Sequence, residues 1–155
     1  MPKSHLATSW QDHRNRVGRW HKRLSTIGRG VPPAMSKDEA LDDVFAFFMN
    51  CYHLRDWVIG SGFKAEADVD AYIRGNDDLA LCRDICTGLK HFRAEPKRAL
   101  FDSSWSTATG TVAMLPSRRE PIPGEHWVIT ANRGDMDMFD LGDRCVAAWD
   151  AFLAS

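Results

Sequence analysis

The sequence predicts a mostly α-helical protein, a bundle of about four helices with a small antiparallel β ribbon before the last one. Apolar side chains recur at helical spacing in several stretches, and glycine and proline separate these stretches. Residues 103–140 follow a different pattern, small and polar with short strand-like runs. The chain has 155 residues, of which 44% are hydrophobic and 26% charged, as expected for a single globular domain over residues 1–155.

A basic amphipathic helix is expected at residues 8–27, followed by a linker rich in glycine and proline up to residue 33. Residues 1–31 hold seven basic side chains and one acidic one, a balance of +6, which leaves −7 for the rest of a chain of net charge −1. This asymmetry predicts an acidic partner, either nucleic acid or the protein's own acidic body. The side chains expected to contact phosphates are Arg14, Arg16, Arg19, Lys22 and Arg23.

Core helices are expected between residues 34 and 102, and the first of them spans residues 37–59. Ser36 and Glu39 have the spacing of a capping box that starts this helix. The helix is apolar over more than half of its circumference, so it should lie centrally. Its remaining arc carries Asn50, His53 and Asp56, and His53 can meet Asp56 across one turn. These three residues are therefore candidate site residues.

A short helix or turn at residues 67–75 leads into a helix at residues 79–92, which Asn76 or Asp77 is expected to cap. Its apolar face is predicted to pack, while Arg83, Asp84 and His91 lie on the opposite, polar face. Asp84 and His91 are two turns apart, so their side chains should lie nearly one above the other. This helix is the leading candidate for a functional site.

The ribbon region, residues 103–140, contains strand-like runs at residues 111–115, 126–131 and 136–139. Residues 132–135 should form a turn between the last two strands, which explains the Arg-Gly-Asp triplet there as turn chemistry. The last helix is expected at residues 141–153, within a C-terminal segment of residues 141–155.

The four cysteines, Cys51, Cys82, Cys86 and Cys145, lie within apolar patterns and form no CxxC pair. They are predicted to be reduced core residues; Cys82 and Cys86 are one turn apart and could share a metal, but core packing is the favoured interpretation. No cofactor is expected. The sequence has no apolar run long enough to span a bilayer and no signal peptide, which predicts a cytoplasmic protein without membrane contact.

With the helices placed, Arg83-Asp84, six further residues and His91 resemble the signature of HEPN-domain proteins. The resemblance extends over residues 37–92 and the last helix. It implies a helical bundle that forms a homodimer with a shared cleft, and a metal-independent endoribonuclease of toxin or defence type acting on RNA, with an antitoxin or other protein as a further partner. By this resemblance His91 serves as acid or base, Arg83 holds the scissile phosphate and Asp84 orients its neighbours.

Two other interpretations remain open. The chain could be a non-catalytic binding or dimerisation module of the same fold. Alternatively, His53, Asp56, Asp84 and His91 could bind a metal ion between two helices, as in metal-binding helical bundles, although neither helix carries a Glu-x-x-His pair. The same four residues could also form a buried structural network.

Overall fold

The computed structural model of the chain describes residues 9–91, 113–116, 125–131 and 134–155. This part of the chain contains five helices, namely α1 (Trp10–Gly28), α2 (Lys37–Gly60), α3 (Glu66–Gly75), α4 (Asp77–His91) and α6 (Met138–Ala154). The prediction of a mostly helical protein is confirmed. The structure has one helix more than predicted, because residues 66–75 form a complete helix. None of these five helices is both long enough and apolar enough to cross a membrane.

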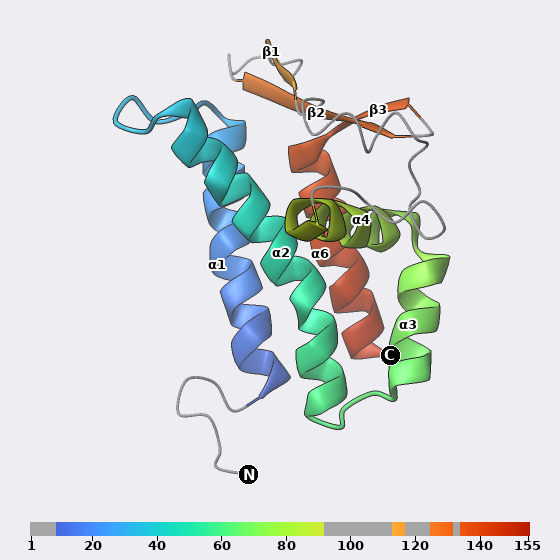
Figure 1. Cartoon of the computed structure of the whole chain (residues 1–155). Helices are drawn as coiled ribbons and strands as arrows, with labels where there is room; N and C mark the ends of the chain where they lie inside the picture. The colour runs from blue at the N-terminus through green and yellow to red at the C-terminus, as the bar shows by residue number, and fades with distance from the viewer. Residues whose placement is uncertain (1–8, 92–112, 117–124, 132–133) are drawn as a thin grey trace.

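Helices α1, α2 and α6 run alongside one another, and α4 lies across α2 and α6 in front of them in Figure 1. Helix α4 contacts both α2 and α6, and α3 packs beside it. Among the α4 residues whose burial is described, seven are buried, namely Leu79, Ala80, Leu81, Cys82, Asp84, Ile85 and Cys86. The core occupies the space between α1, α2, α4 and α6.

Local sequence signals explain where these helices begin. The predicted capping box of α2 is confirmed, since the Ser36 hydroxyl accepts the Glu39 amide N–H at 3.1 Å and the Glu39 carboxylate accepts the Ser36 N–H at 2.7 Å. At the start of α4, the side-chain oxygen of Asn76 accepts the Leu79 N–H at 3.0 Å. These caps satisfy amide groups that have no partner within the helix.

Three strands are paired antiparallel in the order β1 (Ala113–Pro116), β2 (Glu125–Ala131) and β3 (Gly134–Asp137). They lie at the end of the molecule where α6 begins (Figure 1). The predicted third strand and last helix were misplaced, because α6 already begins at Met138 rather than at residue 141. The cause is the Asp137 carboxylate, which accepts the N–H groups of Phe139 and Asp140 and so starts the helix there.

The close approach of α6 to α1 and α2 depends on Gly142. A β-carbon added at this position would lie 2.5 Å from Leu24 Cδ2 on α1 and 3.1 Å from Phe47 Cε1 on α2. Both neighbours are buried, so neither can move away without disturbing the core. A glycine inside a helix costs about 1 kcal/mol relative to alanine. Here that cost is offset by the close packing of three helices.

We expect Gly142→Ala to lower the free energy of unfolding by about 1–3 kcal/mol, the usual cost of overpacking a core. Gly60→Ala is the matched control, because a β-carbon there would meet nothing within 4 Å. This control should leave stability unchanged or raise it by up to about 1 kcal/mol. Urea unfolding of both variants measures the difference, and equal effects at the two positions would contradict the packing described for α6.

Candidate functional site

The polar groups of α4 form a buried ion pair. Nε and Nη2 of Arg83 each lie 3.0 Å from Oδ1 of Asp84. The Asp84 side chain is only 3% exposed, whereas that of Arg83 is 19% exposed. The prediction of a packing face and an opposite polar face on this helix is therefore wrong for Asp84, because its side chain is buried. Arg83 remains partly accessible from solvent.

His91 is the last residue of α4, but its side chain lies outside the described residues. The structure therefore leaves its relation to Asp84 as a prediction. The helix itself does continue through both positions, so the two-turn separation along α4 holds for the backbone.

Of the polar arc on α2, His53 is the residue that approaches α4. Its side chain is exposed, and its Nε2 lies 3.9 Å from Sγ of Cys86, one turn after Arg83. Cys86 is buried, so the contact lies at the edge of the interface between α2 and α4. An exposed imidazole thus adjoins the helix that carries the ion pair.

Asp56 takes part in a different interaction, which links α2 to α3. The Arg55 guanidinium donates to Asp56 at 2.9 Å, to Glu66 at 3.0 Å and to both oxygens of Asp70 at 2.6 and 2.9 Å. These hydrogen bonds lower the pKa of Asp70 below its usual value. The network orients α3 against α2, and the Asp56 carboxylate belongs to its exposed rim.

Asn50 joins α2 to α1. Its side-chain amide donates to the Ala46 carbonyl at 2.8 Å, and its backbone carbonyl oxygen lies 2.9 Å from Nε2 of His13. His13 is 3% exposed and stacks on Trp57, with ring centroids 5.4 Å apart. Burial lowers the pKa of His13, so its neutral form, with Nε2–H donating to Asn50, is favoured. In the sequence, nothing distinguishes this buried histidine from the basic residues around it on α1.

The basic residues of α1 divide into two groups. Arg14 binds Asp150 through two hydrogen bonds of 2.7 and 2.8 Å, and His21 binds Asp143 at 2.7 Å, both on α6. For this part of the helix, the acidic partner is the protein's own body. The other predicted phosphate-binding residues are Arg16, Arg19, Lys22 and Arg23. None of these four forms an ion pair with a described residue.

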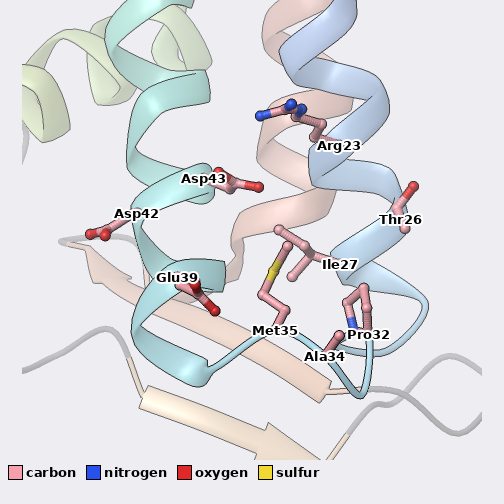
Figure 2. A pocket seen from close by; sticks show the side chains of 9 residues that line it. All are labelled: Arg23, Thr26, Ile27, Pro32, Ala34, Met35, Glu39, Asp42 and Asp43. Carbon is pink, nitrogen blue, oxygen red and sulfur yellow. The ribbon is translucent and has the colours of Figure 1, made fainter.

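A surface pocket of about 590 Å³ lies between the end of α1, the linker and the start of α2. In Figure 2, Arg23 and Asp43 extend toward each other from opposite walls, and Ile27 and Met35 lie nearer the linker. Glu39 and Asp42 complete an acidic wall. The pocket is formed by α1, α2 and the linker, so the Arg83–Asp84 pair on α4 does not line it.

Three of the four cysteines converge. The sulfur atoms of Cys51, Cys82 and Cys145 all lie within 4.8 Å of one another. Within the described ranges this is the one group of three or more histidine, cysteine or acidic side chains close enough to share an ion, so His53, Asp56 and Asp84 do not converge in this way. Cys86 contacts His53 instead of sharing a site with Cys82. All four cysteines are reduced and buried, as the sequence predicts.

The buried neutral state of His13 should make stability depend on pH. Because its pKa is lowered in the folded protein from the usual 6.5, the unfolded chain binds the proton more readily. Stability is therefore full above pH 6.5 and falls as the pH drops toward the folded pKa, by at most about 1.4 kcal/mol per pH unit.

We expect His13→Gln to weaken this acid dependence, as measured by urea unfolding at several pH values. Gln11→Ala, at an exposed position of the same helix that does not titrate, is the control and should leave the dependence as it is. A wild-type protein and a His13→Gln variant with parallel pH profiles would contradict a buried, neutral His13.

Comparison of the chain with protein-family models, with curated proteins and with solved structures gave no match. The proposal for the function of this chain therefore rests on its own side chains. The features that bear on it are the Arg83–Asp84 pair on α4, the neighbouring imidazole of His53 and the exposed basic residues of α1.

Proposed function

We propose that this chain is a HEPN-like protein that cleaves RNA without a metal ion, with α4 as the catalytic helix. The observation that supports this proposal best is the Arg83–Asp84 ion pair on a helix that ends at His91. Burying a carboxylate is costly unless it is paired and hydrogen-bonded, and buried pairs seldom add net stability. A buried pair is better explained as a device that fixes the position of the arginine.

The geometry suits an arginine that holds phosphate. Two guanidinium nitrogens of Arg83 lie at 3.0 Å from the buried carboxylate, which limits the rotation of the group. The side chain is still 19% exposed, so an anionic group can approach it from solvent. A guanidinium carries five N–H donors in a fixed plane and binds phosphate oxygens in a defined orientation. Arg83 would thus stabilise the charge that develops on the phosphorane.

In addition to this stabilisation of charge on the phosphorane, RNA cleavage needs only proton transfers. The ribose 2′-oxygen loses its proton and attacks phosphorus, and the 5′-oxygen leaves with a proton, so the product ends in a 2′,3′-cyclic phosphate. Histidine is the side-chain type that can exchange these protons near neutral pH. We assign this role to His91 by the resemblance, and His53 provides a second imidazole at the edge of the α2–α4 interface.

The RNA would approach along α1. Arg19, Lys22 and Arg23 are exposed, and the Arg23 guanidinium lies 4.9 Å above the ring of Trp20. Cationic side chains follow the phosphate backbone, and aromatic rings stack on exposed bases. The same proposal includes a homodimer with a shared cleft, and an antitoxin or other protein as a further partner. The protein would act in the cytoplasm.

A second candidate function is RNA binding without cleavage, by a module of the same fold. The exposed basic residues of α1 favour it, because they would serve a binding protein equally well. The two functions differ in the role of α4. A pure binding module would not need the Arg83–Asp84 pair for activity.

Purified protein incubated with RNA in EDTA should produce fragments that end in a 2′,3′-cyclic phosphate. We expect Arg83→Ala and His91→Ala each to reduce the cleavage rate by about 10²- to 10⁴-fold, the usual contribution of a positioned acid–base or electrostatic group. Arg74→Ala, at an exposed position on α3, is the matched arginine control and should cleave like the wild type.

Cleavage in EDTA that survives both α4 substitutions would overturn the site assignment. Binding of RNA with no cleavage under any condition would favour the binding module. Circular dichroism of each variant distinguishes loss of activity from loss of the fold.

A further inference from the structure

The three converging cysteines come from three different helices. Cys51 lies on α2, Cys82 on α4 and Cys145 on α6, and each side chain is fully buried. They meet in the part of the bundle where α4 crosses the other two helices (Figure 1). Their sulfur atoms lie within 4.8 Å of one another. None of the chemistry proposed for Arg83, Asp84 and His91 uses this cluster.

The spacing of the sulfur atoms fits a single ion with three sulfur ligands. For bonds of about 2.3 Å from an ion to sulfur, three sulfur atoms are about 4.0 Å apart when the ion lies in their plane, and closer together when an ion with a lone pair lies above that plane. Small side-chain rotations would bring Cys51, Cys82 and Cys145 to this separation from at most 4.8 Å. No described histidine or carboxylate belongs to the group, so the donor set is three sulfurs.

Burial restricts the charge that such a site can carry. Three free thiolates would place three negative charges in the core, and burial raises the pKa of Cys82 and Cys145 accordingly. Hydrogen bonds from the Cys145 and Cys82 thiols lower the pKa of Cys51. Each of these two thiols has only one proton to donate, and each also has a backbone acceptor. The Cys82 sulfur lies 3.4 Å from the Phe48 carbonyl oxygen, and the Cys145 sulfur lies 3.4 Å from the Asp78 carbonyl oxygen. The core thus tolerates little net charge.

A second observation at the cluster is Trp149. It is 1% exposed, and among the described residues no acceptor lies within ordinary hydrogen-bond geometry of its indole Nε1–H. The same group lies close enough to the Cys51 sulfur to lower the pKa of that thiol. A buried donor without an acceptor costs about 1–3 kcal/mol. A Cys51 sulfur that had exchanged its thiol proton for a bond to an ion would keep lone pairs that can accept this N–H.

We propose that Cys51, Cys82 and Cys145 form a binding site for a trivalent thiophilic ion, with arsenic(III) as its representative. Arsenous acid would react with the three thiols so that three As–O and three S–H bonds break. Three As–S bonds form, and each hydroxyl leaves with a thiol proton as water. Arsenic stays trivalent, and the product is neutral. A divalent ion such as zinc would leave one net negative charge in the core and would lack its usual fourth ligand.

Native mass spectrometry tests this site directly in the full-length reduced protein, with a phosphine as reductant because added thiols would bind the ion. After incubation with arsenite we expect the wild-type mass to increase by one arsenic and to decrease by three hydrogens. An adduct with only two sulfurs would lose two hydrogens and keep a hydroxyl. The three-sulfur and two-sulfur adducts therefore differ in mass. This test needs only the wild-type protein and does not depend on whether a variant folds.

Cys86→Ala is the matched control, because Cys86 is buried on α4 one turn after Cys82 but contacts His53. It should retain the three-sulfur adduct, whereas Cys82→Ala, or Cys145→Ala if the former does not fold, should lose it. A wild-type protein with no adduct or only a two-sulfur adduct would overturn the proposal. Retention of the three-sulfur adduct in Cys82→Ala, or its loss in Cys86→Ala, would overturn it as well.

Discussion

The burial of helix α4 is the constraint on which the rest of the structure depends. Because α4 crosses α2 and α6 and also contacts α3, its side chains meet protein on nearly every side. A charged group on such a helix must be paired, and Asp84 is paired with Arg83. The same crossing brings Cys82 of α4 beside Cys51 and Cys145. One packing arrangement thus produces both an ion pair that fixes an arginine and a dry cluster of three thiols.

Helix α1 shows how one basic segment can serve two purposes. Its apolar side chains enter the core, and Arg14 and His21 are bound by carboxylates of α6, so this side of the helix belongs to the fold. These exposed ion pairs add little stability, at most about 1 kcal/mol each, but they set the rotation of α1 about its axis. That rotation leaves Arg19 and Arg23 toward solvent. The excess positive charge is therefore available to an acidic partner.

Features that depend on neighbouring residues could be predicted from the sequence, and features that depend on distant ones could not. The capping box at Ser36 could be predicted because its hydrogen bonds span one turn. The burial of Asp84 was only one of the alternatives, since helical periodicity does not show whether the polar side of α4 is covered. The convergence of Cys51 with Cys145 joins residues far apart in the chain, and the pair Arg14–Asp150 is equally non-local. The helix start at Met138 was misplaced because the strand pattern at residues 136–139 obscured the Asp137 cap.

We propose that the Arg83–Asp84 pair serves RNA cleavage rather than the stability of the fold. The most direct measurement is on the double variant Arg83→Met/Asp84→Leu, which replaces the ion pair with apolar side chains of similar size. Such replacements of buried pairs are often neutral or stabilising by about 1–4 kcal/mol. We expect this variant to keep or increase its free energy of unfolding and no longer to cleave RNA in EDTA. A variant that loses stability but still cleaves RNA would contradict it.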